Sequence, residues 1–266
     1  YQEEDFRLDC EYRQFYSAFD QIEDTTGFEP LRDLVENIYT NEYLETLLPK
    51  WNAAIQEPDA LMALPLQRDF YARNLKNVKE RTVVIISDAM RYEVGKELFR
   101  RIQDDPKCTA KLEVQLGVLP SDTRVGMAAL LPHTELTMSD DFKVLVDGFP
   151  CENLAEREAI LQKYSSDSAC VQFDSIKSLK IADLRSIFTG KQVVYVYHNQ
   201  IDARGDKPNT EDEVFVACQE ATAEIIDLIR RISTRSNTYR FIFTSDHGFF
   251  YKRRKTPEND QSKGSQ

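Results

Sequence analysis

Cysteine is scarce in this sequence and its spacing is uninformative. The five cysteines (Cys10, Cys108, Cys151, Cys170 and Cys218) are odd in number, and no two of them form a Cys-x-x-Cys pair. Neither a disulfide framework nor a zinc knuckle is therefore indicated. A reduced, cytoplasmic compartment is the simpler expectation.

Long apolar runs are missing as well. No stretch approaches the roughly 18 consecutive apolar residues that span a bilayer, and no signal peptide opens the chain. We therefore expect no membrane partner. The chain starts at Tyr1 without a methionine and closes on KTPENDQSKGSQ, so we expect a fragment of a longer protein.

Positive charge is in deficit. The 34 basic and 45 acidic residues leave a formal net charge of -11, which argues against a protein that coats polyanions in general. The 41% hydrophobic content is ample for a packed core, and nothing in the composition indicates global disorder.

The first 79 residues have helical periodicity and no catalytic pattern. Apolar residues recur at helical spacing in three successive stretches. The predicted buried faces consist of Tyr12, Phe15, Tyr16, Phe19 and Ile22, then Leu31, Leu34, Val35, Ile38 and Tyr39, then Leu44, Leu47, Leu48, Trp51 and Ile55. We interpret residues 1–79 as a helical packing or linking segment.

From residue 80 onward, short apolar strands alternate with amphipathic helices. Strands are predicted at 82–87, 112–119, 143–148, 193–198 and 241–245, and helices at 92–102 and 152–164. A long helix is expected after Thr210 and Glu213, which form a capping box. This alternation predicts an α/β fold with a mainly parallel sheet and helices on both faces. The domain is expected to span residues 80–255, followed by a polar tail, 256–266.

Three of the predicted strands run into an aspartate. Asp88, Asp202 and Asp246 follow them, and His247 comes directly after the last. Ligands bind outside the carboxyl ends of strands in open α/β sheets, so neighbouring strands would bring these side chains together. Clustered carboxylates call for a cation, and a mixed Asp/His set suits zinc or manganese. The alternative is that each aspartate is a helix cap or loop residue.

A hydroxyl group is available near such a site. In LPSDTRVGMAALL (119–131), Ser121 and Thr123 directly precede an apolar helical stretch. Free N–H groups at a helix N-terminus favour a phosphate, and a nearby metal could help to deprotonate the hydroxyl. On its own, the pattern is that of an ordinary N-cap.

Four motifs in order give this chain a family resemblance. ISDAMRYEV (86–94), LPSDTRVGMAALLPH (119–133), VYVYHNQIDARGDK (194–207) and FTSDHGFFY (243–251) resemble the successive motifs of the PglZ domain. That domain belongs to the alkaline phosphatase superfamily and occurs in BREX-type phage-defence systems. The resemblance covers roughly residues 80 to 251.

The resemblance implies a site with two divalent ions, zinc or alternatively manganese. Asp88, Asp246 and His247 match the ligands of one ion, and Thr123, rather than Ser121, matches the nucleophile of the phosphodiesterase branch. The segment Asp202-Ala-Arg-Gly-Asp206 matches part of the second site, with aspartate where histidine is usual. Arg91 and Lys207, beside their motifs, are predicted to bind phosphoryl oxygens or to be ordinary solvated charges.

One ligand of the second site has no counterpart in the chain. The superfamily adds a histidine after its Asp-His pair, but the three histidines here are His133, His198 and His247. The missing ligand lies in sequence beyond this chain, or the second site is incomplete. His198 could substitute for it, or it could be a hydrogen-bonded structural residue.

The resemblance predicts a metal-dependent phosphohydrolase, in first place a phosphodiesterase, with a nuclease as one form of it. Its substrate would be a phosphate ester or a nucleic-acid backbone, and its partners other defence-system proteins. The basic run YKRRK (251–255) would suit a nucleic-acid backbone, or is a solvated loop. The alternative function is a non-catalytic assembly or regulatory module, and a phosphomutase is disfavoured because no second substrate-binding domain is evident.

Overall fold

The structure, a computed structural model, describes residues 1, 3–56, 64–205, 213–236 and 238–250. The chain divides into two compact units, a smaller one of Tyr1–Leu61 with Phe249–Gln266 and a larger one of Met62–Gly248. The boundaries predicted at 79/80 and 255/256 stay predictions. The polar tail and Thr210 of the expected capping box lie outside the described residues.

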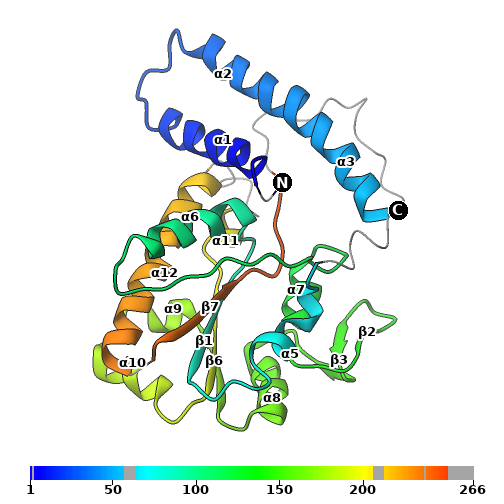
Figure 1. The fold of residues 1–266 in the computed structure, drawn as a ribbon, viewed down its shortest axis with the longest axis vertical. Helices are drawn as coiled ribbons and strands as arrows, with labels where there is room; N and C mark the ends of the chain where they lie inside the picture. Colours follow the sequence, from blue (N-terminus) through cyan, green and yellow to red (C-terminus); the bar gives the residue numbers. More distant parts are fainter. Residues whose placement is uncertain (2, 57–63, 206–212, 237, 251–266) are drawn as a thin grey trace. The chain divides into compact units, whose positions relative to one another are not determined.

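The larger unit is built on a four-stranded parallel sheet with the order β5-β6-β1-β7 (Figure 1). All residues of β1 and β6 are buried, as expected of inner strands covered on both faces. Because β1 pairs in parallel with both β6 and β7, the three strands that run into aspartates are adjacent. The strands are β5 (Ser168–Gln172), β6 (Val193–His198), β1 (Thr82–Ser87) and β7 (Arg240–Thr244).

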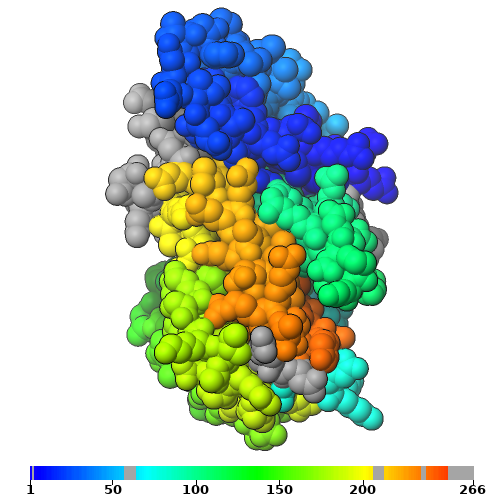
Figure 2. Space-filling model, turned by 90° about the vertical axis from the view of Figure 1, so that its left-hand side faces the viewer, coloured from blue at the N-terminus to red at the C-terminus, as the bar shows by residue number. Residues whose placement is uncertain are grey.

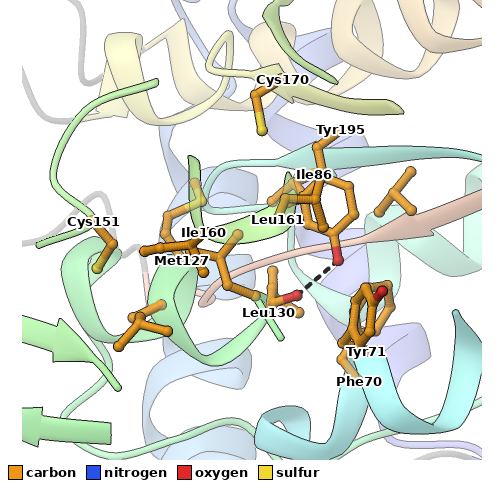
Figure 3. Close-up of a cluster of buried hydrophobic side chains, with 14 of the residues drawn as sticks. Phe70, Tyr71, Ile86, Met127, Leu130, Cys151, Ile160, Leu161, Cys170 and Tyr195 are labelled. Carbon is orange, nitrogen blue, oxygen red and sulfur yellow. Dashed lines mark hydrogen bonds between the residues drawn. The ribbon is translucent and has the colours of Figure 1, made fainter. Parts of the chain in front are cut away.

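Three short helices cover one face of this sheet. Val84 and Ile86 of β1 belong to the hydrophobic cluster on that face, part of which is shown in Figure 3. The Tyr195 hydroxyl donates a 2.8 Å hydrogen bond to the Leu130 carbonyl oxygen, which links β6 to the end of α7. The helices are α5 (Phe70–Asn74), α7 (Thr123–Ala129) and α8 (Leu154–Tyr164).

A second group of helices covers the other face. Val83 and Ile85 of β1 belong to a separate buried cluster on this side, because successive side chains of a strand point to opposite faces. Figure 2 shows the orange surface of α12 beside the yellow-green surface of α10, with which it packs. The helices are α6 (Tyr92–Gln103), α9 (Phe173–Ile176), α10 (Ile181–Phe188) and α12 (Val214–Ser236). The predicted α/β fold is confirmed.

Two of the predicted strands lie outside the parallel sheet. The segment 143–148 contains β3, which belongs to a separate antiparallel sheet with the order β2-β3-β4. The segment 112–119 forms no strand of either sheet, and its one bridge joins Leu116 to Leu66. None of its residues is buried. Its apolar alternation therefore belongs to a partly exposed surface segment and not to a core strand. The remaining elements are β2 (Leu136–Met138), β3 (Val144–Val146), β4 (Phe149–Pro150), η2 (Gln67–Asp69) and α11 (Asp202–Gly205).

The smaller unit is helical, as predicted, and its buried faces agree with the prediction only in part. Leu31, Leu34 and Ile38 are 46%, 54% and 39% exposed, whereas the interior of the unit is rich in tyrosine. Among the described residues, no helix combines the length and apolar character needed to cross a membrane. The elements are α1 (Phe6–Phe19), α2 (Glu29–Asn37), the π-helix η1 (Ile38–Leu44) and α3 (Glu45–Gln56).

Two buried carboxylates explain the preference for tyrosine in this interior. Asp9 and Glu36 are both 2% exposed, and a buried carboxylate is tolerated only where donors surround it. The hydroxyl of Tyr39 donates to Asp9 (2.6 Å), that of Tyr43 to Asp9 (3.2 Å) and that of Tyr12 to Glu36 (2.7 Å). Apolar periodicity therefore located the helices correctly and their buried sides in part. Of the predicted faces, Tyr12, Tyr16, Tyr39 and Leu44 are buried, whereas Ile22, Leu31, Leu34, Ile38 and Trp51 are exposed.

Candidate metal centre

Two buried carboxylates and an imidazole meet at the carboxyl ends of β1 and β7. Asp88 directly follows β1, and its N–H donates a 2.8 Å hydrogen bond to the carbonyl oxygen of His198 at the end of β6. Asp246 and His247 follow β7, the neighbouring strand. Asp88 and Asp246 are 5% and 2% exposed. The sheet thus brings together side chains that are more than 150 positions apart in the sequence.

The spacing of the three ligand atoms suits a single ion. One oxygen of Asp88, one oxygen of Asp246 and a ring nitrogen of His247 all lie within 4.8 Å of one another. The His247 Nε2 atom is 3.4 Å from Asp88 Oδ1 and 3.5 Å from Asp246 Oδ2. Two ligands at tetrahedral zinc, each about 2.1 Å from the ion, would be about 3.4 Å apart.

The same two carboxylate oxygens lack hydrogen-bond donors. Asp88 Oδ1 and Asp246 Oδ2 are fully buried without a hydrogen-bond partner among the described residues, although the other oxygen of Asp246 accepts from the Ala89 N–H at 3.2 Å. Buried unsatisfied carboxylate oxygens are costly and usually signal a missing partner. A divalent cation between them would satisfy both, so the donor set fits zinc or manganese.

The side chain of His247 is oriented with its Nε2 atom toward the two carboxylates. Its Nδ1 atom lies 3.1 Å from the carbonyl oxygen of Gly248, and a carbonyl oxygen can only accept, so Nδ1 carries a proton. A backbone partner on one ring nitrogen directs the other toward a metal in many metal sites. In this arrangement the Nε2 atom is therefore the one that faces the carboxylates.

The metal-free site makes stability dependent on pH. Burial, reinforced by the charge of Asp88, raises the pKa of the Asp246 carboxyl to about 7. The folded protein then holds a proton that the unfolded protein has already released between about pH 4 and pH 7. The free energy of unfolding therefore falls as the pH rises through that window.

We expect Asp246→Asn to remove this fall in chelator-treated protein, because the amide does not titrate. Urea denaturation measures the free energy of unfolding at each pH. Its difference between pH 4.5 and pH 6.5, roughly 1–3 kcal/mol in the parent chain, should be smaller in the variant. Asp227→Asn, at an exposed position of α12, is the matched control and should keep the parent's pH dependence. An equal pH dependence in all three proteins would contradict the buried position of Asp246.

The predicted nucleophile lies beside the ligand atoms. The Oγ1 atom of Thr123 is 2.9 Å from His247 Nε2, and Thr123 is the first residue of α7. Asp122 caps this helix, since its side chain accepts a 3.0 Å hydrogen bond from the Arg124 N–H. Ser121 is exposed. The structure therefore places the hydroxyl of Thr123 at the site.

Comparison with known proteins identifies the family. Residues 69–265 match the family described as "BREX system PglZ alkaline phosphatase-like domain". The chain belongs to this family. The resemblance inferred from the four sequence motifs is thereby confirmed.

Two relatives resemble this chain over nearly all of its length. "Alkaline phosphatase-like protein PglZ" of Bacillus cereus (strain H3081.97) is 39% identical over an alignment of 270 residues, which covers 99% of this chain and 32% of the relative. "Alkaline phosphatase-like protein BrxZ" of Escherichia coli O9:H4 (strain HS) is 36% identical over an alignment of 277 residues, which covers 98% of this chain and 32% of the relative. The chain thus spans about a third of the length of the curated relatives it matches.

Of the other predicted site residues, the structure describes Asp202 and Arg91. Asp202 begins α11 and is not part of the three-ligand group. Arg91 occupies the N-cap position of α6 without a side-chain capping bond and is 8% exposed. Its Cγ atom lies 3.8 Å from the position that a β-carbon would take at Gly248. Asp206 and Lys207 lie outside the described residues. Their predicted roles, in the second metal site and in binding phosphoryl oxygens, stay predictions.

His198 has other partners than a metal. Its Nδ1 atom is 3.0 Å from the Ser87 hydroxyl and its Nε2 atom is 3.2 Å from a Glu224 carboxylate oxygen. The side chain is buried at the end of β6, and it is not part of the three-ligand group. These contacts agree with the alternative of a hydrogen-bonded structural histidine.

Sequence reasoning missed the residues that hold the site in place. The backbone N–H of Ala89 binds Asp246, Gln67 binds the carbonyl oxygen of Asp246 at 2.7 Å, and Gly126 packs against the Asp246 backbone. A glycine inside a helical pattern is a detectable signal of close packing. The other two contacts leave no mark in the local sequence.

Proposed function

We propose that this PglZ domain is a metal-dependent hydrolase of phosphate esters, and specifically a phosphodiesterase. The observation that carries the proposal is the hydroxyl of Thr123, 2.9 Å from His247 Nε2. That nitrogen in turn lies within 3.5 Å of both buried carboxylates. A hydroxyl beside a prospective metal site is the arrangement that nucleophilic phosphoryl transfer requires.

The described residues can be assigned separate chemical roles in this reaction. Asp88, Asp246 and His247 would hold a zinc or manganese ion, which when bound would acidify the neighbouring hydroxyl and withdraw charge from the phosphoryl oxygens. The Oγ1 atom of Thr123 would attack phosphorus, and the bond to the leaving alcohol would break. Water would then release the phosphoryl group from Thr123, and Arg91 would bind a non-bridging oxygen.

The setting of this activity is also a proposal. The family description names the BREX system, and we propose that the protein acts in phage defence, in the cytoplasm and together with other proteins of the system. Asp202, Asp206 and Lys207 are proposed to serve a second ion and the substrate. A nucleic-acid backbone is the substrate we favour, because it is a phosphodiester and would suit the basic run 251–255.

Hydrolysis of bis-(p-nitrophenyl) phosphate and of its monoester by the purified chain tests this function. We expect the diester to be cleaved when manganese or zinc is present, cleavage to stop on addition of EDTA, and excess metal to restore it. Faster hydrolysis of the monoester would reassign the domain to the phosphatases. Cleavage that survives EDTA would reject metal dependence.

The alternative function is a non-catalytic assembly or regulatory module. The observation that favours it is that, in the part of the chain that the structure describes, ligands for one ion are gathered, whereas the resemblance implies two. Such a module would hydrolyse neither ester with either metal, and Asp246→Asn would still recruit its partners. An enzyme and a module are therefore separated by the same assay and one variant.

A further inference from the structure

A buried glutamine joins the two segments that carry the proposed catalytic groups. Gln67 is 2% exposed, lies in the short helix η2, and has no titratable atom. Its side-chain amide donates to the carbonyl oxygens of Ser245 (3.0 Å) and Asp246 (2.7 Å). Its side-chain oxygen accepts from the N–H of Val118 at 2.9 Å.

These three hydrogen bonds span the site. Ser245 and Asp246 belong to the turn after β7 that carries the Asp246 and His247 ligands. Val118 lies five positions before Thr123, on the segment that leads into α7. The backbone N–H of Gln67 also binds the Leu116 carbonyl oxygen at 2.9 Å, so main chain and side chain hold the same segment.

Only an uncharged amide can make this set of contacts. Both donors of the side chain are used on carbonyl oxygens, and its acceptor is used on an N–H group. A glutamate would place carboxylate oxygens against two carbonyl oxygens, and a methionine of similar length would make none of the three bonds. The bonds end on backbone atoms. They therefore hold the main chain of the two segments in place and do not set the side-chain conformation of a neighbouring residue.

We infer that Gln67 is a positioning residue, which sets the distance between the Thr123 hydroxyl and the Asp246–His247 ligands by tying the backbones of both segments to one side chain. The inference rests on the proposed function in one respect, namely that these groups act together on a substrate. The side-chain hydrogen bonds of Gln67 end on backbone atoms and not on the proposed ligand atoms. Its effect would be exerted through the Asp246 carbonyl and through Val118.

The test compares Gln67→Met with Gln192→Met. Gln192 is a matched control because its side-chain amide also donates to a backbone carbonyl oxygen, that of Val78 at 2.6 Å. It lies at the other end of the sheet, where its own carbonyl oxygen accepts from Thr82 at the start of β1. Both variants lose hydrogen bonds from a glutamine side chain to the backbone, but only Gln67→Met loses them next to the site.

Two measurements on the full chain decide the inference. The first is the affinity for manganese or zinc by titration calorimetry. We expect a loss of roughly 10–100-fold for Gln67→Met, the range for partners that orient metal ligands, and a change of less than twofold for Gln192→Met. The second is hydrogen exchange, which should accelerate selectively in residues 117–123 and 245–248 of Gln67→Met.

The outcomes separate this inference from the proposed function. If the parent chain binds metal and both variants bind it equally well, Gln67 is not a positioning residue. If the parent chain binds no metal, the proposed metal function fails and hydrogen exchange decides alone. Selective acceleration in the two segments then supports the role of Gln67, and uniform or unchanged exchange overturns it.

Discussion

Replacement of Thr123 by alanine is expected to lower kcat for diester hydrolysis at least about 1000-fold, the scale seen when a nucleophile is removed. Metal affinity should be unchanged, because none of the three ligand atoms belongs to Thr123. The fold should also persist, since Asp122 and not Thr123 caps α7. Steady-state kinetics with bis-(p-nitrophenyl) phosphate, together with calorimetric titration of manganese, measures both effects.

Two variants control for this loss. Ser121→Ala alters an exposed hydroxyl of the same segment and should keep kcat within about twofold. Thr123→Ser keeps a hydroxyl near the 2.9 Å contact to His247 and should retain measurable turnover. If Thr123→Ala retained the parent's kcat, the nucleophile would have to be another group, and the carry-over of the family pattern to Thr123 would be wrong.

Gly126→Ala is expected to damage the site through the backbone. A β-carbon at Gly126 would lie 2.4 Å from the Asp246 carbonyl oxygen and 2.8 Å from its carbonyl carbon, distances that no packed side chain tolerates. Either α7 or the turn after β7 must move, so we expect a destabilisation of about 1–3 kcal/mol. Metal affinity should fall as well, because a shift of the Asp246 backbone would displace the ligand oxygen that Asp246 carries.

Gly95→Ala is the matched control for this substitution. Gly95 also lies within a helix, α6, but a β-carbon there would meet no atom within 4 Å. Alanine should therefore stabilise this helix by about 0.5–1 kcal/mol. Thermal denaturation and manganese titration of both variants give the comparison. Parental stability and metal affinity in Gly126→Ala would contradict the close approach of α7 to Asp246.

The part of the site that lies at strand ends could be predicted from the sequence. Short runs rich in β-branched and aromatic residues located β1, β6 and β7. The rule that ligands bind beyond the carboxyl ends of parallel strands predicted that Asp88, Asp246 and His247 meet. Asp202 followed the same rule but begins the helix α11. A strand end fixes where a side chain starts, and the local turn then decides where it points.

The part that depends on contacts distant in sequence could not be predicted. Strand β5, SACVQ, is short and half polar, and it is a strand because it pairs with β6. The contact of Gln67 with Asp246 joins residues 179 positions apart. In the smaller unit, Leu31 and Leu34 had the periodicity of a buried face but are exposed. The tyrosines of the predicted faces, Tyr12 and Tyr39, are buried because their hydroxyls donate to the carboxylates of Glu36 and Asp9.

The central claim is that Asp88, Asp246 and His247 together hold a divalent ion next to Thr123. Anomalous diffraction at the manganese edge, from crystals of the chain grown with Mn²⁺, tests it most directly. We predict a peak about 2.0–2.3 Å from Asp88 Oδ1, Asp246 Oδ2 and His247 Nε2. The absence of a peak between these atoms in a chain that hydrolyses the diester would contradict the account.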